Sequence, residues 1–157
     1  MIKIYLTLLT FIILHLPCFS FEYGYNNGFK YIKHYHSESA YQHAYCSIHN
    51  GIEEYENQDK TRVDCLTKDF AIEFDFANKW AECVGQALHY GSLTGKTPKC
   101  VLILDGNDWK NQIVYYNRIK HLGKFYNFCV EYITDDILNI QNTKCIYSDC
   151  KCHKNKS

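Results

Sequence analysis

Phe70-Ala71-Ile72-Glu73-Phe74-Asp75-Phe76 is the stretch that decides the fold. Its large apolar side chains occupy every second position, which is the period of a β-strand with one buried face. The carboxylates of Glu73 and Asp75 would then lie on the opposite face. The segment 62–66 shows the same alternation, with Val63 and Cys65 on its apolar side. The sequence therefore predicts two neighbouring strands.

These two strands are close enough in sequence to form a hairpin with Lys68-Asp69 at its tip. Asp64 would then face Glu73, and Arg62 would face Asp75. Because Lys-Asp is not a favoured two-residue turn, this register is a conditional expectation. Like charges in opposed positions are destabilising unless a positive charge lies between them, and a divalent cation with oxygen ligands would supply that charge. The pattern indicates a metal site, or, for Asp75 alone, an ion pair with Arg62.

A helix is expected to follow the second strand from Ala77 onward. A 3.6-residue period places four residues on one face, which we expect to be buried: Trp80, Ala81, Val84 and Leu88. A polar stripe runs along the opposite side, formed by Lys79, Glu82, Gln86 and Tyr90. This stripe is either a solvated surface with a Lys79–Glu82 ion pair or one wall of the carboxylate site.

The remaining periodic segments complete an α/β pattern. A first helix is expected to begin near Ser37, with a capping box formed by Ser39 and Gln42, and to end at Asn50-Gly51. Strands are expected at 52–56, 100–104 and 125–133, and another helix at about 108–121. The order helix, three strands, helix, strand, helix, strand predicts an α/β fold with a mixed central sheet flanked by helices.

The N-terminal residues differ in composition from the rest of the chain. Lys3 precedes an apolar run from Ile4 to Leu16, and Pro17-Cys18-Phe19-Ser20 resembles a signal-peptidase site. The run is too short for a comfortable membrane span. Residues 1–20 are therefore predicted to be a cleaved signal peptide, which makes the mature protein secreted or periplasmic and without stable membrane association. An uncleaved anchor is the alternative.

Residues 21–36 are rich in Gly, Asn and Tyr, and they are predicted to form an extended arm. Basic and aromatic residues alternate along it, as in grooves that bind nucleic acid and also in ordinary surface segments. The whole chain has 17 Lys and Arg residues and 17 Asp and Glu residues. Removal of the signal peptide takes away only Lys3, so the mature chain has a net charge of −1. Contact with nucleic acid must then come from a local patch and be weak and salt-sensitive.

Eight of the nine cysteines lie after the signal peptide: Cys46, Cys65, Cys83, Cys100, Cys129, Cys145, Cys150 and Cys152. An even number behind a signal peptide implies an oxidising compartment and up to four disulfide bonds. Cys46 with Cys65 is one candidate pair, since the first helix should pack on the hairpin. Residues 135–157 form a Cys-rich tail, which we expect to be tied down by at least one bridge among Cys129 and the last three cysteines. Zinc binding in the tail is the alternative, although its spacing matches no standard pair of CxxC knuckles.

The acidic hairpin and the helix that follows it resemble the core of the PD-(D/E)XK nuclease superfamily. The resemblance rests on Asp64 on one strand, Glu73-x-Asp75 on the next, and Gln86-x-x-x-Tyr90 on the helix. It covers roughly Ser37 to Leu104 and implies a restriction-endonuclease-like core within a domain over 37–134. More narrowly, the segments 37–42, 61–67, 71–76 and 79–90 resemble a group of small exported bacterial proteins of unassigned role.

The resemblance implies a role for each acidic residue of the hairpin. Asp64 matches the motif aspartate and Glu73 the second acidic ligand of Mg²⁺ or Mn²⁺. Asp75 stands where the superfamily has its lysine, so it would extend the metal site. Lys79, one turn into the helix, would return an ammonium group to the place of the missing lysine.

Three further residues complete the implied site. Gln86 and Tyr90 match the helix motif that lines the site of exonuclease-type members, and Glu38 resembles the additional acidic residue of their first helix. The implied activity is metal-dependent hydrolysis of phosphodiester bonds in DNA or RNA. The alternative is a catalytically inactive, disulfide-stabilised binding module on the same fold, which the neutral charge and Asp75 favour.

Overall fold

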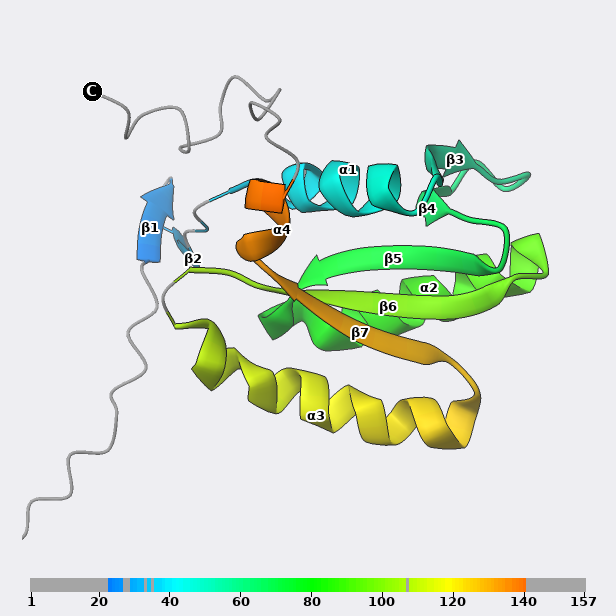
Figure 1. Ribbon diagram of the computed structural model, residues 1–157. Coiled ribbons are helices and arrows are strands. Elements are labelled where there is room, and N and C mark those ends of the chain that lie inside the picture. The colour runs from blue at the N-terminus through cyan, green and yellow to red at the C-terminus, as the bar shows by residue number, and fades with distance from the viewer. Residues whose placement is uncertain (1–22, 27–28, 33, 35, 107, 141–157) are drawn as a thin grey trace, which may run out of the picture.

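A computed structural model describes residues 23–26, 29–32, 34, 36–106 and 108–140 (Figure 1). The predicted signal peptide and the cysteines at 145, 150 and 152 lie outside these residues. The predicted arm contains a small antiparallel hairpin, in which β1 (Tyr23–Asn26) pairs with β2 (Phe29–Ile32). The arm is therefore not simply extended.

A five-stranded mixed sheet forms the centre of the domain (Figure 1). Its strands, in spatial order, are β3 (Ile52–Glu56), β4 (Arg62–Leu66), β5 (Phe70–Phe76), β6 (Thr97–Leu104) and β7 (Cys129–Thr134). The first three are antiparallel neighbours joined by short turns, and the last three are parallel. Parallel neighbours need crossover connections, which the chain makes with helices. The predicted mixed sheet and order of elements are confirmed.

Helices cover both faces of the sheet. The helices α1 (Glu38–Ile48) and α4 (Asp136–Ile140) contact each other on one face, while α2 (Trp80–Thr94) and α3 (Trp109–Tyr126) lie on the other face (Figure 1). The one-turn 3-10 helix η1 (Ala77–Lys79) joins β5 to α2. The crossover helices are α2, between β5 and β6, and α3, between β6 and β7. They lie on the same face of the sheet because both connections have the same handedness and both lead to the next strand in the same direction.

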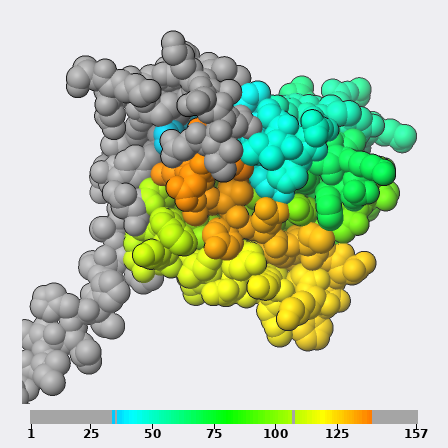
Figure 2. All heavy atoms as spheres, in the orientation of Figure 1, coloured from blue at the N-terminus to red at the C-terminus, as the bar shows by residue number. Residues whose placement is uncertain are grey.

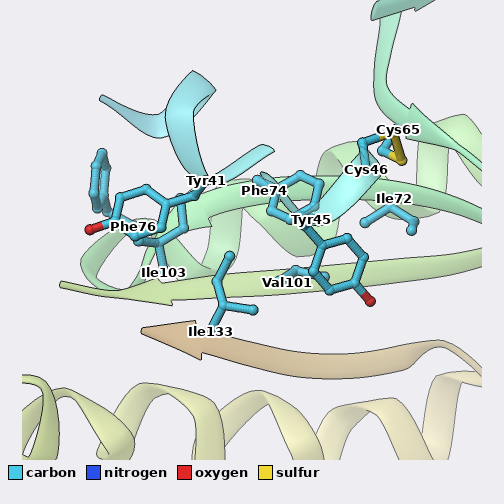
Figure 3. Close-up of a cluster of buried hydrophobic side chains, with 10 residues drawn as sticks. All are labelled: Tyr41, Tyr45, Cys46, Cys65, Ile72, Phe74, Phe76, Val101, Ile103 and Ile133. Atoms are coloured by element: carbon cyan, nitrogen blue, oxygen red, sulfur yellow. A yellow bond between two sulfur atoms is a disulfide. The ribbon is translucent and has the colours of Figure 1, made fainter. Parts of the chain in front are cut away.

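The strand β5 is buried on both faces, contrary to the expectation of one exposed face. Its apolar side chains pack under α1 in the cluster of Figure 3, which contains Tyr41, Tyr45, Cys46, Cys65, Ile72, Phe74, Phe76, Val101, Ile103 and Ile133. On the other side, α2 covers β5. As a result Glu73 is only 5% exposed and Asp75 only 2%. Two acidic residues that the alternation assigned to the polar face of the strand therefore lie in the interior.

Two disulfide bonds connect these layers. The predicted Cys46–Cys65 bond joins α1 to β4, and a second bond, which the sequence did not single out, joins Cys83 of α2 to Cys100 of β6. Gly51 lies against both sulfur atoms of the first bond, so a Cβ atom there would collide with them. Cys129 has no disulfide partner within the described residues. Both bonds are compatible with an extracellular or periplasmic protein.

Candidate active site

The hairpin of β4 and β5 has the predicted register, and it opens at Asp64. Cys65 pairs with Ile72 and Leu66 with Ala71, and the tip lies at Lys68-Asp69. Beyond Cys65 the regular ladder ends. There the Asp64 Oδ2 atom accepts a hydrogen bond of 2.8 Å from the backbone N–H of Phe74. The side chain of Asp64 thus replaces a strand partner, and its position is set by the backbone of β5.

The sheet is irregular around Asp64 on its other side as well. The β3–β4 ladder includes Glu53–Cys65 and Tyr55–Val63 but omits the pair between them, and Glu54 has a positive φ of 52°. Val63 packs with Ala71 and Tyr90, whereas Cys65 belongs to the cluster beneath α1. The prediction that Val63 and Cys65 share one face is therefore wrong. Irregularities of this kind redirect a side chain next to functional sites.

Gln42 of α1 stabilises this irregular segment. Its Nε2 atom donates to the backbone carbonyl of Asp64 and to Glu54 Oε1, each at 2.8 Å. The predicted capping box is wrong, because Ser37 is the N-cap residue and Ser39 Oγ donates to Ser37 Oγ. Sequence reasoning assigned Gln42 to a helix terminus and so missed its role in holding Asp64. Only the three-dimensional packing of α1 on β4 shows it.

Four carboxyl groups from three elements interact in this interior. They belong to Glu38 of α1, Asp64 of β4, and Glu73 and Asp75 of β5. Burial, followed by the charge of Asp64 and a hydrogen bond to it, raises the pKa of Glu73 to about 10. Glu73 is therefore a neutral acid at pH 7 in the absence of a cation, and its protonated carboxyl group donates a hydrogen bond to the Asp64 carboxylate.

The other three carboxyl groups are shifted in the same direction. Burial and the charges of Asp75 and Asp64 raise the pKa of Glu38 to about 7. Burial raises the pKa of Asp64 to about 6, although the Phe74 N–H and the Glu73 hydrogen bond oppose the shift. Burial also raises the pKa of Asp75, against the opposing charge of Lys79. The upward shifts mean that the protein does not supply enough positive charge to keep all four carboxyl groups ionised.

One carboxylate oxygen of the cluster is buried without a hydrogen-bond partner in the described part of the chain. The Oε2 atom of Glu73 is buried and has no hydrogen-bond partner among the described residues. A buried polar atom without a partner costs stability, so such an atom at a cluster of oxygen donors fits a missing cation. The donors are all carboxylates, which suit Mg²⁺ and Mn²⁺ better than softer metals. Within the described ranges, however, no three acidic, His or Cys side chains are already arranged around a metal position.

Lys79 lies beside this cluster, as the resemblance implied. Its Nζ atom is 3.3 Å from Asp75 Oδ1, and its side chain is about half exposed, at 49%. Burial lowers the pKa of Lys79, but the charges of Asp75, Glu38 and Glu82 outweigh burial, so the net shift is upward. Lys79 therefore stays protonated. The alternative in which Asp75 pairs with Arg62 is wrong, since Arg62 instead lies 3.9 Å from Glu54.

The polar residues of α2 reach the same site. Tyr90 is buried and donates a hydrogen bond of 3.0 Å to Gln86 Oε1. Burial and the charges of Glu73 and Asp64 raise the pKa of Tyr90 to about 12, so its hydroxyl keeps its proton. Glu82 of the predicted stripe is exposed.

The predicted buried face of α2 is right for Trp80 and Val84, which pack against the core, and wrong for the other two residues. Ala81 and Leu88 are exposed, and the helix instead buries Cys83, Ala87 and Tyr90. The sequence pattern was misleading because the disulfide bond of Cys83 and the site contact of Tyr90 decide which side faces the sheet. The polar stripe therefore borders the core and the carboxylate cluster.

Comparison with protein-family models, with curated proteins and with solved structures finds no match to this chain. None of the helices in the described ranges combines the length and hydrophobicity of a membrane span.

Proposed function

We propose that the protein is an exported, metal-dependent hydrolase of phosphodiester bonds in nucleic acid. The observation that supports this most strongly is the buried, partnerless Glu73 oxygen within a cluster of four carboxyl groups, of which those of Glu73 and Asp75 are buried and those of Glu38 and Asp64 half-buried. The resemblance to the PD-(D/E)XK superfamily, which implies a restriction-endonuclease-like core, supplies the reaction class. Export fits the two disulfide bonds and the sequence of residues 1–20.

Asp64 and Glu73 are the residues that would hold Mg²⁺ or Mn²⁺, with Asp75 and Glu38 as further oxygen donors. Bound there, the cation would activate a water molecule and neutralise charge that develops on the phosphoryl group. A cation would also favour the ionised forms of these carboxyl groups, including Glu73. The backbone N–H of Phe74 and the amide of Gln42 keep Asp64 in place for this role.

Lys79 supplies a positive charge beside the acidic cluster. Because it is half exposed and remains protonated, it can contact a substrate phosphate that approaches the metal-binding carboxylates. Its contact with Asp75 orients the ammonium group toward β5. Tyr90 and Gln86 complete the wall of the site on α2, where the Tyr90 hydroxyl holds the Gln86 amide.

The second candidate function is a catalytically inactive binding module. Asp75 favours it, because this carboxylate occupies the position of the superfamily lysine and has Lys79 as its ion-pair partner. In that case the disulfide bonds would stabilise a surface whose acidic site has no catalytic function.

Cleavage by the oxidised protein tests the proposal. Single-stranded and duplex DNA and RNA are incubated with Mg²⁺ or Mn²⁺, and with EDTA as the metal-free control. We expect metal-dependent cleavage by the wild type and none by Asp64→Ala. Lys60→Ala, which changes an exposed lysine paired with Glu56, should cleave as the wild type does. Equal activity of Asp64→Ala and wild type, or no activity with either metal, would favour the binding module.

A further inference from the structure

The outer face of α3 is positively charged, although the chain as a whole is neutral. The helix contains four Lys and Arg residues and no Asp or Glu, although the full sequence has 17 of each class. All four basic residues are exposed: Lys110, Arg118, Lys120 and Lys124. The nearest acidic residue in sequence is Asp108, which precedes the helix and is bonded by Asn111. Figure 2 shows α3, in yellow, along the lower side of the molecule.

Aromatic rings accompany these cations. Arg118 lies over two of them, with its Cζ atom 5.1 Å from the centre of the Trp80 ring and 5.5 Å from that of Tyr115. Lys110 lies over Trp109 at 5.9 Å. Phe125, two turns beyond Arg118, is 72% exposed. We call this the basic-aromatic surface; it consists of Trp80, Trp109, Lys110, Tyr115, Arg118 and Phe125.

The basic-aromatic surface adjoins the element that carries Lys79. Trp80 directly follows Lys79, and η1, which carries Lys79, packs against α3. Ala77 of η1 belongs to a buried core cluster, and the partly buried side chains of Trp80, Trp109 and Tyr115 pack against that cluster. A ligand strand bound at Lys79 could therefore extend to Trp80, the next residue, and from there to Arg118, which lies over the Trp80 ring.

We propose that the basic-aromatic surface binds a single-stranded segment of nucleic acid that extends from the carboxylate site along α3. The inference rests on the proposed function and names the form of its substrate. Phosphates would be neutralised by Arg118 and Lys110, while unpaired bases would stack on the aromatic rings and on the guanidinium group. A duplex hides the faces of its bases, so interleaved rings would contribute little to duplex binding.

An anionic membrane is the other polyanion that a basic helix can bind, and the orientation of α3 argues against it. Helices that lie on membranes insert a wide apolar face into the lipid. In α3 the side that carries Gln112, Ile119 and Gly123 is buried against the protein. The outward side presents four cations with two large exposed apolar residues, Val114 and Phe125, and the rings of Trp80, Trp109 and Tyr115 are partly exposed at its margins. This is not a wide apolar face, and it suits a nucleic-acid strand.

Binding is measured without catalysis, in EDTA, by the fluorescence anisotropy of a labelled oligo(dT) titrated with the oxidised protein. Arg118→Ala should bind at least about fivefold more weakly and should lower the dependence of log K on log salt by about 0.7. Arg118→Lys keeps the charge and loses the planar stacking group, so the salt dependence should stay while the affinity falls. Lys60→Ala is the matched control, because it removes one exposed lysine from the turn between β3 and β4.

The two tryptophans of the chain, Trp80 and Trp109, report where the strand lies. In Trp109→Phe the remaining Trp80 should be quenched by saturating oligo(dT). Saturation without quenching, wild-type affinity in Arg118→Ala, or quenching by phosphatidylserine vesicles but not by oligo(dT) would overturn the surface assignment. Metal-dependent cleavage in spite of any of these results would leave the proposed function intact. Binding as expected with no cleavage in Mg²⁺ or Mn²⁺ would refute the proposed function and leave the surface assignment standing.

Discussion

Replacing Glu73 with glutamine should stabilise the metal-free protein at neutral pH. Glu73 has a pKa of about 10 in the folded state and an ordinary value of 4.5. Between these values the folded state binds a proton that the unfolded state releases, so this group makes stability fall as pH rises. At pH 7 the protonation costs the wild type about 3 kcal/mol, at 1.36 kcal/mol per pH unit above 4.5. Glutamine has the same shape, needs no proton and can still donate to Asp64.

The assay is urea unfolding in EDTA at pH 4, 7 and 9, with the disulfide bonds intact. Glu73→Gln should match the wild type near pH 4 and exceed it by up to about 3 kcal/mol at pH 7. Glu82→Gln changes an exposed carboxylate on α2 and should alter stability by less than about 0.5 kcal/mol. A Glu73→Gln protein that is less stable than the wild type at pH 7, or that has the same pH dependence, would refute the assignment of Glu73 as a buried neutral acid.

Three other substitutions separate the roles within the site and the fold. Lys79→Ala should abolish cleavage but keep the metal-induced rise in melting temperature, because the ammonium is not a ligand; loss of both would contradict that role. Asp75→Asn should weaken the metal-induced rise, measured by the same thermal scan, and an unchanged rise would mean that Asp75 serves Lys79 alone. Replacing Cys46 and Cys65 together with alanine opens a link of sequence separation 19 and should cost about 3 kcal/mol in urea unfolding. A loss below about 1 kcal/mol would show that the bond adds little constraint.

The signal peptide should be cleaved before about Phe21, so mass spectrometry of protein recovered from the periplasm or medium should find a chain that begins there. Protein that still begins at Met1 in a membrane fraction would contradict cleavage. Fewer than eight reactive thiols should be found in denaturant without reductant.

The hairpin could be predicted from sequence because two short-range patterns agree there. Alternation sets which residues of β5 share a face, and the two-residue tip sets the register between Cys65 and Ile72. The pairing of Cys46 with Cys65 followed from placing the first helix on this hairpin. These inferences needed only neighbours in sequence and one packing step.

Burial of the site could not be predicted in the same way. Alternation assigns Glu73 and Asp75 to the polar face, but it does not reveal that α2 covers that face. The irregularity at Asp64 and the hydrogen bonds of the Gln42 amide depend on contacts between α1, β3 and β4. The periodicity within a single helix or strand does not reveal contacts between elements. The face of α2 was mispredicted because a disulfide bond and Tyr90, rather than the largest apolar side chains, turn it toward the sheet.

Thermal unfolding in the presence of Mg²⁺ or Mn²⁺ tests the central claim most directly, because it detects a cation at Asp64 and Glu73 without requiring a known substrate. At a concentration about 100-fold above the dissociation constant, the ion should add about 2.7 kcal/mol and raise the melting temperature by about 5 to 10 °C. The rise should be absent in Asp64→Ala and in Glu73→Ala and present in Glu82→Gln. No rise in the wild type at millimolar metal, or an equal rise in Asp64→Ala, would contradict the metal site and with it the proposed hydrolase.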